Sequence, residues 1–111
     1  MNNQPTAVPH AAIDYSDAER WTQDGDFPDV DGTRVRAYDD VVLLSETLSE
    51  DDFGIRVPAG TVGTVLFHCG DADGLLQLEV YPEPIRSGVD IGYARPSQVR
   101  LHQTNEKKYP R

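Results

Sequence analysis

The sequence has little sulfur and no long apolar run. It contains one methionine and one cysteine, Cys69, so no disulfide can form within the chain. A helix that crosses a bilayer needs about 20 consecutive apolar residues, and no such run is present. The chain does not open with a basic segment followed by an apolar stretch, which is the pattern of an export signal. We therefore expect a cytoplasmic protein that does not bind a membrane.

Positive charge is also scarce. The 19 acidic residues outnumber the 10 lysines and arginines, and the formal net charge is -9. Nucleic-acid binding depends on lysine and arginine side chains that displace counterions from the phosphate backbone. Between residues 38 and 102 the basic residues are Arg56, Arg86, Arg95 and Arg100. We therefore expect no nucleic-acid partner.

Motifs for catalysis or metal binding are missing from the sequence. His10, His68 and His102 are far apart and there is no second cysteine, so the chain lacks the ligand spacing of a zinc site. Cys69 follows His68 directly, and adjacent residues on a strand point to opposite faces, so they cannot act as nucleophile and base. Phosphate-binding loops and nucleophile elbows are absent. We predict no catalytic residue, no cofactor and no metal, and hence no enzyme.

The sequence does contain a pattern typical of a small β domain. In the stretch from Val57 to Phe67, Pro58 and Gly60 predict a turn, and apolar residues follow on a strand. Gly63 lies inside this strand, where a glycine marks a β-bulge or a close approach of another backbone. A chain of 111 residues suits one domain. We therefore expect a mainly β fold, a small five-stranded SH3-like barrel.

Alternating apolar residues predict four more strands. These strands cover residues 38–44, 75–81, 89–93 and 99–101, and a single helical turn at Pro96–Gln98 precedes the last. The first strand is apolar on both faces, which indicates a central or covered position. The predicted core consists of Val42, Leu44, Val65, Phe67, Leu78, Val80, Ile91, Val99 and Leu101.

The first third of the chain is polar and acidic. We divide the chain into an N-terminal arm at residues 1–36, the barrel at 37–103 and a polar tail at 104–111. A short helix is expected over residues 17–23 of the arm. The apolar residues of the arm either dock on the barrel, which we favour, or form a segment that binds a partner. They are Ile13, Tyr15, Trp21 and Phe27.

Four segments of the chain carry a family resemblance. They read Y-D-D-V-V-L-L-S-E-T-L from Tyr38, V-P-A-G-T-V-G-T-V-L-F from Val57, L-E-V-Y from Leu78 and A-R-P-S-Q-V-R-L from Ala94. The pattern resembles the DUF4926 group of small bacterial SH3-like proteins, and related patterns occur in KOW domains and in the nitrile hydratase β subunit. The resemblance implies a stand-alone binding module, such as an antitoxin or an immunity protein, rather than an enzyme.

Acidic and aromatic residues are the candidates for binding a partner protein. The loop at residues 45–55 is acidic, and aromatic side chains lie in the arm and on the third and fourth strands. The candidates are Trp21, Phe27, Glu46, Glu50, Asp51, Asp52, Tyr81 and Tyr93. The same residues also suit a solvated loop and cross-strand contacts that cover a barrel face.

Two functions follow from these observations. In the first, the protein is a non-catalytic interaction module whose acidic surface binds and neutralises a partner protein with a basic surface, as an immunity protein or antitoxin does. In the second, it is an accessory subunit or assembly factor of an enzyme, by analogy of fold with the nitrile hydratase β subunit.

Overall fold

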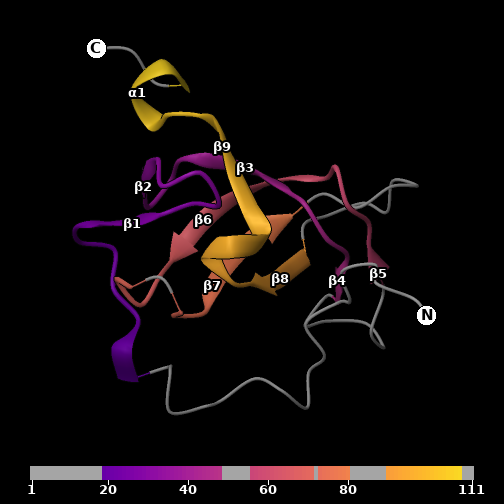
Figure 1. The fold of residues 1–111 in the computed structure, drawn as a ribbon, viewed down its shortest axis with the longest axis horizontal. Coiled ribbons are helices and arrows are strands. Elements are labelled where there is room, and N and C mark those ends of the chain that lie inside the picture. The colour runs from indigo at the N-terminus through magenta and orange to yellow at the C-terminus, as the bar shows by residue number, and fades with distance from the viewer. Residues whose placement is uncertain (1–18, 49–55, 72, 81–89, 109–111) are drawn as a thin grey trace.

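A computed structural model of the chain describes residues 19–48, 56–71, 73–80 and 90–108 (Figure 1). These residues form a mainly β domain with one five-stranded antiparallel sheet and two two-stranded sheets. The elements are β1 (Asp26–Pro28), β2 (Arg34–Arg36), β3 (Asp40–Leu43), β4 (Thr47–Leu48), β5 (Arg56–Val57), β6 (Val62–Phe67), β7 (Leu76–Val80), β8 (Asp90–Ala94), the 3-10 turn η3 (Pro96–Gln98), β9 (Val99–Gln103) and the short helix α1 (Asn105–Lys108). No helix in the described ranges is long and apolar enough to cross a membrane.

The five strands predicted from the sequence form the large sheet, but they do not close into a barrel. Their order is β8-β7-β6-β3-β9, and all neighbouring pairs are antiparallel. The strands β8 and β9 are the two edges and do not pair with each other, so the described strands form an open sheet. The central position of β3 and the helical turn at Pro96–Gln98 are confirmed.

The predicted face of β3 was wrong. Val41 and Leu43 lie in the core, whereas Val42 and Leu44 are half-buried on the other face. Both faces of β3 are apolar, so alternation could not decide between them. The face that packs in the same cluster as Phe27 and Val35 carries Val41 and Leu43. The hydrophobic core consists of Phe27, Val35, Val41, Leu43, Val57, Val65, Leu76, Leu78, Val80, Ala94 and Val99, with Leu101 packed against it.

Two other predicted core residues lie elsewhere. The register of β6 and β7 shifts between Val65 and Phe67, so Phe67 lies opposite Gln77. Such an irregularity turns the following side chains toward the opposite face of the sheet. Ile91 packs in a second, smaller cluster with Leu75 and Tyr93. Val65, Leu78, Val80 and Val99 are confirmed as core residues.

The last part of the predicted arm belongs to the domain. Strands β1 and β2 form a hairpin, and Phe27 and Val35 from this hairpin are 0% exposed and lie in the main core. The boundary at residue 36 was therefore wrong, because it cut through a unit that shares one core with the sheet. Of the four apolar arm residues, Ile13 and Tyr15 lie outside the described residues.

The helix predicted over residues 17–23 does not extend to its expected end. Thr22 forms an antiparallel β-bridge with His68, in which each backbone N–H donates to the carbonyl of the other residue at 2.8 and 3.0 Å. A residue in such a bridge has extended rather than helical backbone. The start of the predicted helix, residues 17–18, lies outside the described part of the chain.

The side chain of Asp29 connects the β1–β2 hairpin to the sheet. One of its carboxylate oxygens accepts from the N–H groups of Asp31 (2.8 Å) and Thr33 (2.9 Å) in the hairpin turn, and the other accepts from the N–H of Leu101 (2.8 Å). Next to it, Val30 N–H donates to the carbonyl of Val99 at 3.0 Å. Asp29 is 6% exposed, so a buried carboxylate joins the turn to the outer edge of β9.

Gly63 lies where the backbone of β7 approaches closely, as expected. A Cβ atom at this position would lie 3.0 Å from Val80 Cγ1 and 3.3 Å from the carbonyl oxygen of Glu79. The irregularity of β6 lies further along the strand, between Val65 and Phe67, so Gly63 is explained by the close approach. The predicted turn before β6 is confirmed, because Gly60 has a φ of +92° and Thr61 N–H donates to the Pro58 carbonyl at 3.3 Å.

The role of Asp29 predicts a large loss of stability in the Asp29→Ala variant. The substitution removes the acceptor of three part-buried backbone N–H groups. A fully buried unsatisfied donor costs about 1–3 kcal/mol, and the cost is smaller where water reaches the donor. We expect the unfolding free energy from urea denaturation to fall by about 2–3 kcal/mol. Asp31→Asn is the matched control from the same turn, because it breaks an exposed ion pair that contributes about 0–1 kcal/mol. Equal losses in the two variants would contradict this role of Asp29.

The close contact at Gly63 predicts that even a methyl group is destabilising there. In Gly63→Ala the Val80 side chain or the backbone of Glu79 must move, and overpacking of this kind costs about 1–3 kcal/mol. Gly63→Val should lose more. Gly92→Ala on β8 is the control in the same sheet, because its Cβ would lie 3.5 Å from the nearest atom, Thr47 Cγ2. Thermal unfolding that shows both alanine variants equally stable would reject the close approach.

Candidate functional site

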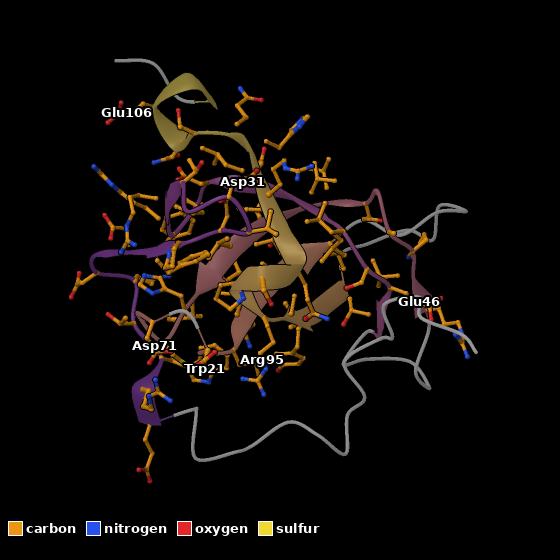
Figure 2. All side chains as sticks on the ribbon, in the orientation of Figure 1. Trp21, Asp31, Glu46, Asp71, Arg95 and Glu106 are labelled. Atoms are coloured by element: carbon orange, nitrogen blue, oxygen red, sulfur yellow. The ribbon has the colours of Figure 1, made fainter. Side chains whose placement is uncertain are left out.

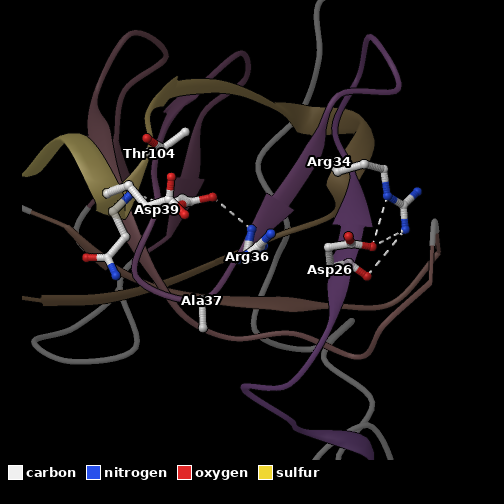
Figure 3. Close-up of a pocket in the computed structure, with 8 residues that line it drawn as sticks. Asp26, Arg34, Arg36, Ala37, Asp39 and Thr104 are labelled. Atoms are coloured by element: carbon white, nitrogen blue, oxygen red, sulfur yellow. Dashed lines mark hydrogen bonds and ion pairs between the residues drawn. The ribbon is translucent and has the colours of Figure 1, made fainter.

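A polar cleft of about 630 Å³ lies between the β1–β2 hairpin, the turn after β2 and the start of α1 (Figure 3). Five of the lining residues come from the hairpin and the turn after it, and three come from the chain after β9. The lining residues are Asp26, Arg34, Arg36, Ala37, Asp39, Thr104, Asn105 and Glu106. The cleft is therefore built from two segments that are far apart in the sequence.

Two of the three carboxylates in the cleft are held by the protein itself. Asp39 is buried and accepts from the N–H of Arg36 (2.9 Å) and the N–H of Asn105 (2.7 Å), so it joins the turn to the beginning of α1. Asp26 accepts from the guanidinium of Arg34 at 2.6 and 3.0 Å. The hydrogen bond from Arg34 lowers the pKa of Asp26, which therefore stays ionised.

Arg36 and Glu106 are the remaining charged residues of the cleft. Both are exposed, and neither side chain forms an ion pair or hydrogen bond within the part of the chain that the structure describes. The cleft contains no histidine or cysteine, and its single hydroxyl group belongs to Thr104. In the described ranges, no three histidine, cysteine, aspartate or glutamate side chains are grouped to hold a metal ion. The exposed charges of Arg36 and Glu106 are therefore the groups of the cleft that can make electrostatic contacts.

Tyr38 is a strained residue next to the cleft. It has a φ of +71°, it is the non-glycine residue with positive φ in the described ranges, and its side chain is 45% exposed. The surrounding contacts hold it in place. The Tyr38 N–H donates to the Val65 carbonyl at 2.7 Å, and the Tyr38 hydroxyl accepts from Gln23 Nε2 at 2.8 Å. In the same turn the Asp39 N–H donates to the Arg36 carbonyl at 3.1 Å. Backbone strain of this kind is concentrated at functional sites.

The structure brings two of the predicted partner-binding residues together. The rings of Trp21 and Tyr93 lie 6.4 Å apart, and Trp21 has the same centroid distance to Phe67. Trp21 is half-buried, whereas Tyr93 is 6% exposed. Phe27 is fully buried in the core. The prediction that Phe27 and Tyr93 anchor a partner needs correction, because their side chains offer almost no surface in this structure.

The predicted acidic loop is described only at its two ends. Glu46 pairs with Arg56 across the β4–β5 hairpin, and Figure 2 shows it well separated from Trp21. Glu50, Asp51, Asp52 and Tyr81 lie outside the described residues, so their roles stay predictions.

Several acids that the sequence places in a charged arm have structural roles instead. Asp26 pairs with Arg34, Asp29 holds the hairpin turn, and Asp31 pairs with Arg100. The ion pair with Asp31 raises the pKa of Arg100. The free acidic surface is therefore smaller than the composition of residues 1–36 indicates.

A second group of acids does not take part in such pairs. Glu19, Asp24 and Asp73 are exposed, and their carboxylates make no ion pair within the described part of the chain. They lie near Trp21, because Arg20 pairs with Asp71 and so joins residues 19–25 to the β6–β7 turn. Figure 2 shows Trp21 and Asp71 at the same end of the molecule. We call Trp21 with Glu19, Asp24 and Asp73 the acidic end.

The cleft was not predicted from the sequence. One signal was present, since Arg34 and Arg36 alternate in an otherwise acidic segment and so point to the same face of a strand. The position of Thr104 and Asn105 beside them depends on the pairing of β3 with β9, which local patterns do not show.

Comparison with protein-family models, with curated proteins and with solved structures finds no match to this chain. The resemblance to the DUF4926 group therefore stays a prediction.

The positive φ of Tyr38 predicts an unusual order of stability. Tyr38→Gly and Tyr38→Ala both lose the aromatic ring and the hydrogen bond from Gln23. Glycine tolerates the left-handed conformation, whereas alanine has a Cβ that costs about 1–2 kcal/mol there. We expect the glycine variant to be more stable than the alanine variant by about 1 kcal/mol in chemical denaturation. An alanine variant as stable as the glycine variant would show that the turn carries no strain.

Proposed function

We propose that the protein is a non-catalytic protein-interaction module that binds and neutralises a partner protein with a basic surface, in the manner of an immunity protein or antitoxin. The observation that supports this proposal most directly is the distribution of charge. Arg20, Arg34, Arg56 and Arg100 each form an ion pair with a carboxylate of the same chain, while the acids of the acidic end stay unpaired. Arg95 places one positive charge at this end, because its guanidinium donates to the Asp73 carbonyl at 2.8 Å, but the three carboxylates outnumber it. The charge left for a partner is therefore mainly negative.

The acidic end has the composition of a docking surface. Trp21 is half-buried and makes aromatic contacts beneath it, so it is held in place before any partner binds. Tryptophan is enriched among the residues that contribute most to interface energy. Unpaired carboxylates around such an anchor attract a basic surface and accelerate association.

The polar cleft supports binding rather than catalysis. Asp39 and Asp26 are both held by groups of the same chain, so neither is free to transfer protons. The charged groups left in the cleft, Arg36 and Glu106, have opposite signs and suit contacts at the rim of an interface.

We also propose that the fold is an open variant of the SH3-like barrel and that the protein acts in the cytoplasm. The first proposal is supported by the strand order, in which the last strand, β9, pairs with β3, and by the η3 turn immediately before β9. SH3-like domains are commonly binding modules, but this argument is one of analogy.

Salt and charge variants test the proposed function. The partner is first captured from the source cells with the tagged protein and identified, and association is then measured at two salt concentrations. We expect the on-rate to fall as the screening length decreases to about 8 Å at 0.15 M salt. The triple variant E19Q/D24N/D73N should lower the on-rate at least about tenfold at low salt and change the off-rate less.

The matched control changes the net charge by the same amount, but at carboxylates that form ion pairs with arginine. The triple variant D26N/D31N/E46Q removes three carboxylates that already have arginine partners, so its on-rate should stay within about threefold of the wild type. Equal effects of the two variants would mean that only the total charge matters, and the acidic end would lose its role. A partner that proves to be an enzyme subunit would instead favour an accessory or assembly function.

A further inference from the structure

His68 is a buried polar residue without a hydrogen-bond partner. It lies at the end of β6 and is 0% exposed, and its ring packs against Phe27 with centroids 5.1 Å apart. Neither Nδ1 nor Nε2 makes a hydrogen bond within the described part of the chain. Buried polar side chains nearly always have a partner, and each exception needs an explanation.

A short segment of chain covers this histidine. We call residues 19–25 the latch segment. The bridge between Thr22 and His68 holds it to β6, and Gln23 Nε2 donates to the Leu66 carbonyl at 2.9 Å. Trp21 adds its contacts with Phe67 and Tyr93. Two further side-chain contacts hold it: Arg20 pairs with Asp71 in the β6–β7 turn, and Gln23 Nε2 donates to the Tyr38 hydroxyl at 2.8 Å. The latch segment is therefore attached by one β-bridge and a small number of side-chain contacts.

The latch segment ends at a natural hinge. Gly25 has a φ of +72° with open space around it, and β1 begins at the next residue. Beyond that point the chain is anchored, because Phe27 is in the core and the Asp29 carboxylate is tied to β9. Opening of residues 19–25 can thus occur while the hairpin and the sheet stay folded.

The charged groups around His68 are few. Burial has the largest effect and lowers the pKa of His68. The backbone of Gly25 and Asp24 and the carboxylates of Asp24 and Asp26 act in the opposite direction and raise it. None of these groups makes a hydrogen bond to the ring. Arg34 and Arg36 on β2 act on Asp26, which reduces its effect. Cys69, which follows His68 in the chain, lies just beyond the end of β6. The neutral ring is therefore the form that fits the closed latch.

We propose that the latch segment is a pH-sensitive switch, closed while His68 is neutral and opened when the buried ring takes up a proton. Opening brings the ring into water, where the charged form is solvated, and it moves Trp21 away from Phe67 and Tyr93. The acidic end is partly built from this segment, so the switch would also alter that surface. The proposal itself concerns the chain alone and does not rest on the proposed function.

The direction of the effect follows from linkage. In the open state His68 has an ordinary pKa of about 6.5, whereas in the closed state the pKa is lower. Below about pH 6.5 the open state binds a proton that the closed state does not, so the closed-to-open ratio falls about tenfold per pH unit until the closed-state pKa is reached. Above about pH 6.5 His68 is neutral in both the open and the closed state, so the closed-to-open ratio does not change with pH.

The test uses Trp21, which is the single tryptophan of the chain. Acrylamide quenching of its fluorescence and far-UV circular dichroism are measured on the full chain between about pH 7.5 and 5.5, a range that spans the ordinary histidine pKa. We expect Trp21 to become several-fold more accessible to acrylamide as the pH falls, while the circular dichroism spectrum stays native.

Histidine variants test whether the pH dependence of Trp21 quenching comes from His68. In His68→Leu the quenching should stay at its neutral-pH value throughout, because an apolar side chain cannot take up a proton. His102→Asn is the control, since this histidine is exposed on β9, and it should respond as the wild type does. If His68→Leu does not fold, NMR titration of the wild-type histidine rings replaces it, and the His68 protonation curve should coincide with the quenching curve.

Four results would overturn the proposal. They are wild-type quenching that does not change with pH, an unchanged response in His68→Leu, a His68 protonation curve separate from the quenching curve, or quenching that rises only together with loss of the native circular dichroism signal. The last result would mean that the whole domain unfolds rather than the latch segment.

Discussion

The carboxylate of Asp29 is the interaction on which most of the described structure depends. It satisfies three backbone N–H groups from two parts of the chain and so joins the first hairpin to the last strand. With the hairpin in this position, Phe27 and Val35 complete the core, and the outer edge of β9 is covered. An uncovered edge strand pairs readily with other chains, and the same contact occupies backbone groups of Val99 and Leu101 on this edge.

The carboxylates of this acidic chain serve two different purposes. Some are buried or paired and hold the fold together, as Asp29, Asp39 and Asp31 do. Others, such as Glu19, Asp24 and Asp73, stay on the surface near Trp21. Because the structural acids and the arginines compensate one another, the negative field comes from a smaller part of the surface. This separation is what gives the acidic end a defined place on the molecule.

The positions of the five strands of the large sheet could be predicted because their apolar residues alternate, and Gly63 could be predicted because a glycine interrupts a strand. The face of β3 could not, since Val41 and Leu43 alternate as well as Val42 and Leu44, and only packing against distant parts of the chain decides which pair is buried. The β1–β2 hairpin was missed because Phe27 and Val35 are isolated among polar residues. The cleft and the surroundings of His68 depend on contacts between distant segments, which no local pattern contains.

Native-state hydrogen exchange tests the central claim most directly, namely that the β1–β2 hairpin folds as one unit with the sheet while residues 19–25 open separately. We expect the amides of Asp31, Thr33 and Leu101 to exchange only through global unfolding, with the same free energy as core amides of β7. The amides of Thr22 and His68, which form the bridge, should exchange through a smaller opening. Faster exchange at Asp31 and Thr33 than in β7, or exchange of Thr22 and His68 only through global unfolding, would contradict this account.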